Sequence, residues 1–345
     1  FYSYNFYNKI SDLTFEIDNE LSCLLSTSGT TGDVKYAKIS IENLLDNTKK
    51  ISNVLKINSK DVTITTMPPH YSYALSVINT HLFKGASIIL NNYSIIDRNF
   101  WKLFKKFKPN NLNGVPYIYE ILKKINFQKM NIKSLKYMTQ AGGKMDERIK
   151  DFFIDICNKK KIQLYIMYGQ TEASPRMAIL PWRLLNKFPN SVGFPLEGSK
   201  VQIEKKFKFK KKMYGEIVYY GKNVFQGYSK NYKDLINKNS ENGKLNTGDL
   251  GYLGKNGLIY ITGRKKRILK IFGIRISLDD VENELKKDNI ESICLGDDKK
   301  LKISYKSKIN KENLIQKIKN ITRLPRNFIE VTNIKRINRN EVGKI

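Results

Sequence analysis

The sequence predicts an α/β protein with a large unit of several subdomains, followed by a small, mobile α+β unit. Short apolar runs alternate with amphipathic stretches as far as residue 167, and this alternation is typical of a mainly parallel sheet with helical crossovers. From residue 193 short strands separated by glycines indicate a β-rich subdomain. After Gly263-Arg264 strands and helices alternate again. We therefore expect a large domain over residues 1–262 and a small domain over residues 263–345.

Individual elements follow from periodicity and from helix-capping residues. We expect helices over residues 40–57, 78–83, 97–107, 145–160, 278–287 and 311–320, and one after Pro116. We expect strands over residues 23–25, 85–90, 111–114, 135–139, 164–167, 201–203, 217–220, 258–261, 268–271, 292–295 and 302–305. Ser40 and Ser277 should cap the helices that follow them. An apolar stripe is expected on the first helix, formed by Ile41, Leu44, Leu45, Ile51 and Leu55.

The chain is strongly basic, with 62 Lys and Arg against 32 Asp and Glu and a net charge of +30. A charge of this size raises the possibility of nucleic-acid binding. The basic residues are scattered through all the expected helices, however, and only residues 205–212 are dense, at an expected hairpin tip. We therefore favour solvated basic faces, which would also attract ATP, CoA or an acidic carrier protein.

The cysteines and the hydropathy of the sequence give expectations about the cellular compartment of the protein. The three cysteines, Cys23, Cys157 and Cys294, lie far apart and have no metal-binding spacing. We interpret them as reduced core thiols of a cytoplasmic protein. No apolar run approaches the length that spans a bilayer.

The stretch from Ser26 to Lys35 predicts a polyphosphate-binding loop. An apolar run, expected as a buried strand, leads into Ser26-Thr27-Ser28-Gly29-Thr30-Thr31-Gly32, and Lys35 follows. Glycines and small hydroxyl residues let backbone N–H groups approach an anion, and the lysine adds a full positive charge. The spacing is not that of a Walker A loop. A Ser/Thr/Gly turn between two strands is the simpler alternative.

This loop resembles the phosphate loop of the adenylate-forming (AMP-binding) enzymes, a superfamily of acyl-CoA synthetases, peptide-synthetase adenylation domains and luciferases. Further motifs follow in the family's order as far as residue 345. Val34 stands where the family commonly has proline, and Tyr36 where it commonly has glycine. Members usually carry a sizeable segment before this loop, whereas this chain has 25 residues there. The resemblance thus implies a large domain that lacks part of its N-terminal segment.

Two motifs after expected strands resemble the family's nucleotide contacts. In Tyr168-Gly169-Gln170-Thr171-Glu172 the resemblance implies that the Tyr168 ring stacks on adenine, Thr171 contacts the phosphate of AMP and Glu172 holds Mg²⁺. A carboxylate among phosphates requires a cation between them, so the chemistry fits. Gly142-Gly143 resembles the segment that lies along adenine, although Lys144 replaces the usual glutamate. Taken alone, each motif would be an ordinary turn at the end of a strand.

Motifs nearer the C-terminus resemble the family's ribose, hinge and adenylation residues. Asp249 in Thr247-Gly248-Asp249 would accept hydrogen bonds from both ribose hydroxyls, a task that suits a carboxylate. Arg264 would contact the nucleotide, and Lys266 would be the hinge between the two domains. Lys270 would face the site during thioester formation. Lys344 would bridge the substrate carboxylate and the α-phosphate, which makes it the residue most specific to adenylation.

The resemblance implies an acid–thiol ligase. Such an enzyme uses ATP and Mg²⁺ to convert a carboxylic acid to an acyl-adenylate, releases pyrophosphate, and transfers the acyl group to CoA or carrier-protein phosphopantetheine. Ala74 replaces the aspartate that pairs with the α-ammonium in amino-acid-activating relatives, and a buried ammonium without a counter-charge would be costly. We therefore favour a fatty or other non-amino acid. The alternatives are an amino-acid ligase for a carrier protein and a non-catalytic basic binding protein on a decayed adenylation fold.

Overall fold

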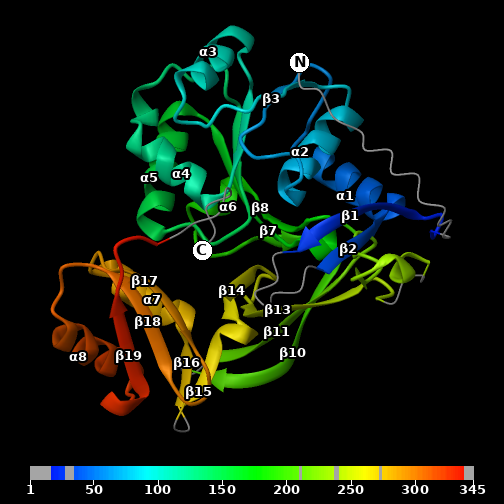
Figure 1. The fold of residues 1–345 in the computed structure, drawn as a ribbon. Helices are drawn as coiled ribbons and strands as arrows, with labels where there is room; N and C mark the ends of the chain where they lie inside the picture. The colour runs from blue at the N-terminus through cyan, green and yellow to red at the C-terminus, as the bar shows by residue number, and fades with distance from the viewer. Residues whose placement is uncertain (1–16, 28–34, 210–211, 237–240, 272–273, 338–345) are drawn as a thin grey trace.

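The computed structural model describes residues 17–27, 35–209, 212–236, 241–271 and 274–337. Their buried apolar residues form three separate cores. One lies around a seven-stranded sheet, one within the β-rich part, and one within residues 269–331 (Figure 1). This arrangement confirms the predicted α/β class, with a β-rich subdomain and a C-terminal α+β part. The predicted domain boundary at residues 262/263 remains a prediction, and strand β14 (Ile259–Arg264) runs across it.

The seven-stranded sheet has the order β4-β3-β5-β6-β7-β8-β9, and the neighbouring strands from β4 to β7 are parallel. The strands are β3 (Val62–Ile64), β4 (Ser87–Ile89), β5 (Asn111–Gly114), β6 (Tyr137–Gln140), β7 (Gln163–Gly169), β8 (Arg176–Leu180) and β9 (Phe194–Pro195). Strands β8 and β9 join antiparallel to their neighbours. The carboxyl ends of parallel strands share one edge, where ligands of such folds gather.

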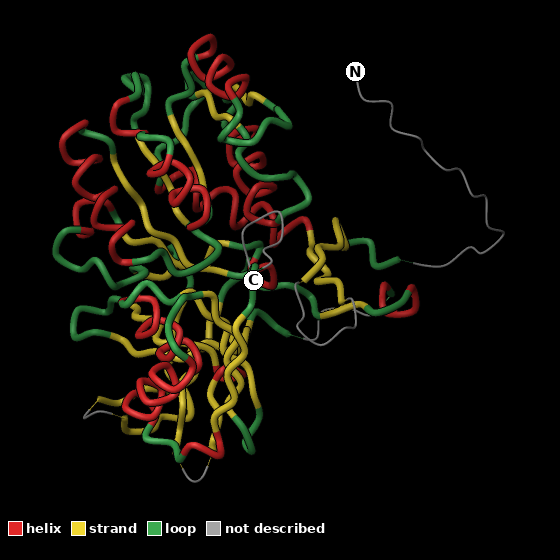
Figure 2. Tube along the Cα trace, turned by 60° about the vertical axis from the view of Figure 1, so that its left-hand side comes forward, coloured by secondary structure: helices red, strands yellow, loops and turns green. Residues whose placement is uncertain are grey.

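Helices cover both faces of this sheet. Helices α1 (Ile41–Val54) and α2 (Ser72–Phe83) lie on one side, and α3 (Arg98–Phe107), α4 (Pro116–Lys124) and α5 (Glu147–Lys160) lie on the other (Figure 1). Figure 2 shows helices on both sides of the strands. The short α6 (Trp182–Leu185) follows β8. None of the helices among the described residues is long and apolar enough to cross a membrane.

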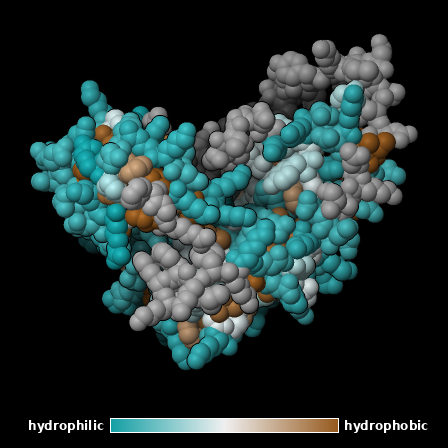
Figure 3. All heavy atoms as spheres, turned by 90° about the horizontal axis from the view of Figure 1, so that it is seen from below, coloured by the Kyte–Doolittle hydropathy of each residue, from teal (hydrophilic) through white to brown (hydrophobic). Residues whose placement is uncertain are grey.

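Antiparallel strands build the β-rich part. Strands β10 (Lys200–Phe209), β11 (Lys212–Tyr220), β13 (Lys244–Leu253) and β14 form one sheet, and β1 (Leu21–Thr27), β2 (Lys35–Ser40) and β12 (Tyr228–Ser229) form another. Phe209 pairs with Lys212, so the dense basic segment lies at a hairpin, as predicted. The face shown in Figure 3 is mostly hydrophilic, with small hydrophobic areas between.

The C-terminal part contains β15 (Ile268–Ile271), β16 (Ile274–Ser277), α7 (Leu278–Lys287), β17 (Glu291–Gly296), β18 (Leu301–Lys306), α8 (Lys311–Thr322) and β19 (Ile329–Asn333). Its core contains no residue from before Leu269. Ser277 caps α7 by accepting a hydrogen bond from the backbone N–H of Asp280, as predicted. This part therefore has a hydrophobic core of its own.

Two expectations about burial are wrong. Ser40 caps α1 as predicted, but Ile41 and Leu45 are about half exposed. The buried side of α1 is mostly polar, with Asn43, Asn47, Thr48 and Ser52 beside Ile51, because side chains there bond to backbone groups of other segments. Only Leu25 is buried in β1, since this strand pairs with β2 in a small three-stranded sheet. Strand β4 is half exposed because it is the edge of its sheet.

Candidate nucleotide site

Three of the predicted site residues meet where β7 ends. The Tyr168 hydroxyl donates a hydrogen bond to Asp249 Oδ2 over 2.6 Å, and Arg264 Nε lies 3.0 Å from Asp249 Oδ1. Tyr168 comes from β7, Asp249 from β13 and Arg264 from β14, opposite Asp249 in the register of the two strands. Residues separated by up to 96 positions in the chain (168 to 264) thus form one cluster.

Burial controls the electrostatics of this cluster. Asp249 is 4% exposed, and desolvation raises the pKa of its carboxyl although the positive charge of Arg264 and the hydrogen bond from Tyr168 oppose the shift. Desolvation, with the charge of Asp249, raises the pKa of the Tyr168 hydroxyl well above its ordinary value. Tyr168 therefore remains a neutral donor at physiological pH, and Asp249 keeps oxygen lone pairs for further donors such as a diol.

A second group of contacts follows directly in the chain. Thr171 begins the short 3-10 helix Thr171–Ala173. Its hydroxyl shares a hydrogen bond of 3.0 Å with the hydroxyl of Ser72 in α2. Glu172 Oε1 accepts a hydrogen bond of 2.8 Å from the Tyr228 hydroxyl. The Lys35 ammonium lies 5.9 Å from the centre of the Tyr228 ring. A second cluster is therefore formed by Glu172, Tyr228 and Lys35, and it contains one carboxylate and one cation.

Close packing explains two of the predicted glycines. Gly142 has φ +83°, and a Cβ there would lie 2.6 Å from the Tyr71 hydroxyl. A Cβ on Gly169 would lie 1.8 Å from the carbonyl oxygen of Pro175. Gly143 is exposed, and its carbonyl accepts a hydrogen bond of 2.8 Å from Gln140 Nε2. Gly142 and Gly143 follow β6, and Gly169 ends β7, so both motifs lie at the carboxyl edge of the sheet.

The predicted phosphate loop joins β1 to β2. Ser26 pairs with Tyr36 and Thr27 with Lys35, and the Thr27 hydroxyl donates to the Lys35 carbonyl over 3.1 Å. The hairpin brings the two ends of the loop together. The loop residues Ser28, Gly29, Thr30, Thr31 and Gly32 lie outside the described residues.

Of the residues predicted for the C-terminal part, Arg264 lies in this cluster, and no described contact brings Lys266 or Lys270 into it. Lys266 lies exposed in the 3-10 helix Lys265–Arg267, between β14 and β15. Lys270 is exposed in β15, and its backbone N–H donates to Asp298 over 2.8 Å. Lys344 lies outside the described residues.

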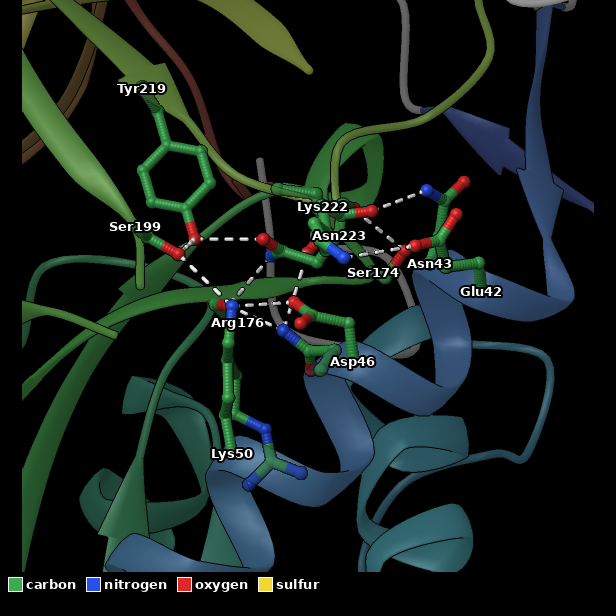
Figure 4. A network of polar contacts seen from close by, with 12 residues as sticks. Glu42, Asn43, Asp46, Lys50, Ser174, Arg176, Ser199, Tyr219, Lys222 and Asn223 are labelled. Carbon is green, nitrogen blue, oxygen red and sulfur yellow. Dashed lines mark hydrogen bonds and ion pairs between the residues drawn. The ribbon is translucent and has the colours of Figure 1, made fainter. Parts of the chain in front are cut away.

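The segment after Glu172 is held by side chains that the sequence analysis did not assign. Asn47 of α1 donates from Nδ2 to the Arg176 carbonyl over 2.6 Å, and Asn223 donates to the Ala173 carbonyl over 2.6 Å. Ser174 donates to the Asn223 carbonyl over 3.0 Å. Figure 4 shows this network between α1 and the segments that carry Arg176, Tyr219 and Asn223. Together with Ser72 and Tyr228, these residues fix the Thr171–Arg176 backbone, and no local pattern in the sequence pointed to them.

The described residues contain no group of three or more His, Cys, Asp or Glu side chains that could hold a metal ion. Mg²⁺ is usually bound by one or two carboxylates together with substrate phosphates, and a single carboxylate such as Glu172 fits that mode. A hollow of about 460 Å³ opens elsewhere, lined by Ser40, Asn43, Lys200 and Lys222 among others, and none of the predicted site residues lines it.

Comparison with known proteins identifies the family of the chain. The family of AMP-binding enzymes matches residues 14–229. The medium-chain fatty-acid–CoA ligase of Escherichia coli K12 is 26% identical over 270 residues, which cover 77% of this chain and 47% of the relative. The 2-succinylbenzoate–CoA ligase of Bacillus mycoides is 27% identical over 271 residues, which cover 77% and 54%. The chain thus spans about half the length of these relatives.

Solved structures show the same fold. The o-succinylbenzoate coenzyme A synthetase of Bacillus subtilis, solved with ATP and magnesium, superimposes with a TM-score of 0.75 at 20% identity. The match covers 97% of this chain and 71% of that one. The structure of the same synthetase with its acyl-adenylate intermediate has a TM-score of 0.74 and covers 93% and 67%. Because the family match extends over more than half of the sequence, this chain belongs to the family of AMP-binding enzymes.

Proposed function

We propose that this chain binds ATP and catalyses the activation of a carboxylic acid to an acyl-adenylate, followed by transfer of the acyl group to a thiol. The observation that carries the proposal is the cluster of Tyr168, Asp249 and Arg264, which is held by polar contacts of 2.6 and 3.0 Å. Thr171 and Glu172 follow Tyr168 closely in the chain. Family membership and relatives that are CoA ligases support it.

Each motif has a proposed place around the nucleotide. Adenine would lie against the Tyr168 ring and the exposed Gly142-Gly143 turn, and the ribose hydroxyls would donate to Asp249 beside Arg264. The phosphates would bind the loop from Ser26 to Gly32 (Ser26, Thr27, Ser28, Gly29, Thr30, Thr31 and Gly32), together with Lys35 and Thr171. Glu172 would hold Mg²⁺, whose charge would screen the phosphates during the reaction.

In the proposed first step an oxygen of the acid's carboxylate attacks the α-phosphorus of ATP. A bond from that oxygen to phosphorus forms, and the bond to the pyrophosphate oxygen breaks. A carboxylate is a weak nucleophile, so the residues of the site act mainly by positioning the reactants and by neutralising charge. Lys344 would bridge the carboxylate and the α-phosphate.

In the proposed second step a thiol attacks the acyl carbon and AMP leaves. The small domain, residues 263–345, would rotate about Lys266 between the two steps and bring Lys270 toward the site. Its separate core supports treating it as a unit that moves as one body. The thiol would come from CoA, as the names of the relatives suggest, or from the phosphopantetheine of an acidic carrier protein in the cytoplasm.

The acid is proposed to lack an α-ammonium group. Ala74 is 4% exposed and offers no counter-charge where amino-acid-activating relatives have aspartate. The relatives include ligases for a medium-chain fatty acid and for 2-succinylbenzoate. A non-amino carboxylic acid is therefore the substrate class, and an amino acid is the alternative that the assay below must exclude.

The test is mass spectrometry of AMP-linked products after incubation with ATP, Mg²⁺ and a panel of fatty, aryl, dicarboxylic and amino acids. We expect acyl-AMP and pyrophosphate from a non-amino acid. Lys344→Ala should lower the rate of adenylation by about 10²–10³, as the loss of one preorganised charge does. Lys335→Ala, an exposed lysine near the same end, is the matched control and should leave the rate unchanged. Absence of acyl-AMP with all acids, or equal loss in both variants, would contradict the proposal.

A further inference from the structure

The interface between α2 and the seven-stranded sheet is unusually polar. The Tyr73 hydroxyl shares a hydrogen bond of 2.6 Å with Thr139 of β6, and Thr139 donates to Asn113 over 2.5 Å. Asn113 in turn donates to Asn111 over 2.8 Å, and Asn111 lies 3.1 Å from His81 Nε2 at the other end of α2. All five of these residues are buried. A helix that only packs on a sheet would present apolar side chains here.

Arg176 lies in the same layer, and its charge has no ion-pair partner among the described residues. It is 1% exposed, and its Nη2 donates to the Ser76 carbonyl of α2 over 2.9 Å. Nη1 contacts the Met167 sulfur at 4.0 Å, and Nε has no hydrogen-bond partner among the described residues. The guanidinium also lies over the Tyr73 ring, 5.8 Å from its centre. A buried guanidinium without a carboxylate is energetically costly, so its retention calls for an explanation.

A second unsatisfied donor lies on the same face of the sheet. Tyr137 and Thr139 of β6 are two residues apart and therefore point to the same side, which is the side of α2. The Tyr137 hydroxyl is buried without a hydrogen-bond partner among the described residues. Apart from burial, the pKa of Tyr137 is raised by the negative charge of Asp61 and lowered by the positive charge of Arg176. A guanidinium N–H and a hydroxyl that both lack an acceptor point to a missing anionic or strongly accepting group.

The position of Arg176 links this layer to the proposed reaction. Arg176 is opposite Gly169 in the β7–β8 register, and it contacts Ser76, one helical turn after Ser72. Ser72 shares its hydrogen bond with Thr171. If the reacting carboxylate meets the α-phosphate beside Thr171, the rest of the acid extends along α2. Four residues of helix rise by about 6 Å, so an acid in this position would place its far end about one helical turn along α2, on the side where Arg176 contacts Ser76.

We propose that Arg176 is a specificity residue that binds a second anionic group at the far end of the acid, so that the substrate is a short dicarboxylic acid. The proposal rests on the function proposed above. Arg176 would offer Nε and Nη1 in the fork geometry that matches a carboxylate. The Tyr137 hydroxyl would donate a further hydrogen bond. A fatty acid would leave these donors unsatisfied and would place methylene groups against the polar layer.

The test compares adipate with hexanoate, which has the same number of carbons and one carboxylate. In wild type we expect kcat/KM for pyrophosphate release to favour adipate by about 100-fold, because a site with buried polar groups rejects an analogue that cannot pair with them. Arg176→Met should reduce this ratio about 100-fold, while Arg176→Lys should keep part of it. Asn223→Ala loosens the same backbone without touching the guanidinium, and it should affect both acids alike.

Binding provides a readout that does not depend on turnover. Adipate should raise the Tm of wild type in the presence of ATP and leave the Tm of Arg176→Met unchanged, and hexanoate should raise neither. A preference for hexanoate, or an adipate effect that survives in Arg176→Met, would overturn the proposal. If adipate protects wild type through Arg176 but no acid releases pyrophosphate, the proposed reaction fails and the anion site stands.

Discussion

Two buried charged residues beside the end of β7, Asp249 and Arg176, have different numbers of polar partners. Asp249 is 4% exposed, and both of its oxygens have partners, the Tyr168 hydroxyl at 2.6 Å and Arg264 at 3.0 Å. Arg176 is 1% exposed, and its guanidinium has one good hydrogen bond, to the Ser76 carbonyl. The proposed nucleotide half of the site is thus organised by paired charges, whereas Arg176 on the α2 side has no ion-pair partner among the described residues. This difference is the reason for proposing that a second anionic group binds beside Arg176.

The largest expected effect concerns the paired charge. Asp249→Ala should weaken ATP binding by about 100-fold, because the variant removes the acceptors proposed for both ribose hydroxyls and the partner that orients Tyr168. Isothermal titration calorimetry with ATP and Mg²⁺ measures the change. Glu216→Ala is the matched control, since Glu216 is a buried carboxylate of β11 paired with Lys265 at 3.0 Å. Equal losses in the two variants would remove Asp249 from the nucleotide site.

The second prediction concerns Arg176 and the stability of the protein without ligand, which its removal should increase. Arg176→Met replaces a buried cation that has no ion-pair partner among the described residues by an apolar side chain of similar length, so we expect the free energy of unfolding to rise by about 1 kcal/mol. Urea unfolding without ligand measures it. If stability instead falls by several kcal/mol, Arg176 holds the structure together and the comparison drawn above fails.

A third test follows from the ionisation of Asp249. Burial raises the pKa of its carboxyl, with Arg264 and Tyr168 opposing the shift. Between the ordinary pKa of about 4 and the raised value, the folded state binds more protons than the unfolded state. The contribution of Asp249 to stability should therefore fall as pH rises through this window and stay constant above it. Urea unfolding of wild type and Asp249→Asn from pH 4 to 7 should show the difference, and parallel curves would contradict it.

Sequence patterns predicted most of the fold because helix caps and the alternation of strands and helices depend on residues that are close in the chain. The alternation of strands and helices gave the parallel sheet, and Ser40 and Ser277 were correctly identified as helix caps. The error on α1 has a physical cause. Apolar periodicity placed Ile41 and Leu45 inward, but that side of the helix buries Asn43 and Asn47, which bond to the Lys222 and Arg176 carbonyls. Those carbonyls come from segments more than a hundred residues away.

The candidate site also contains some residues that sequence motifs predicted and others that only the structure identified. Tyr168, Asp249 and Arg264 were predicted from short motifs, and the structure brings them together. Ser72, Tyr228 and Arg176 were not assigned, because a serine in a helix or an arginine in a strand has no distinctive neighbours in the sequence. Their roles depend on tertiary contacts with Thr171, Glu172 and Ser76. Only the fold reveals that Arg176 has no ion-pair partner in the part of the chain that the structure describes.

The smallest expected effect lies where the C-terminal part meets the start of α5. Lys286 of α7 lies 3.0 Å from Asp146, the residue that caps α5, and its charge helps to lower the Asp146 pKa against desolvation. The Lys286 side chain is 47% exposed, so solvent screens the pair and Lys286→Ala should change the free energy of unfolding by less than about 1 kcal/mol. Asp146→Ala also removes the helix cap and should cost about 1 kcal/mol more. Urea unfolding of both variants gives the order, and a larger loss in Lys286→Ala would contradict it and show that Lys286 acts mainly through other contacts, such as that with Glu120 at 4.0 Å.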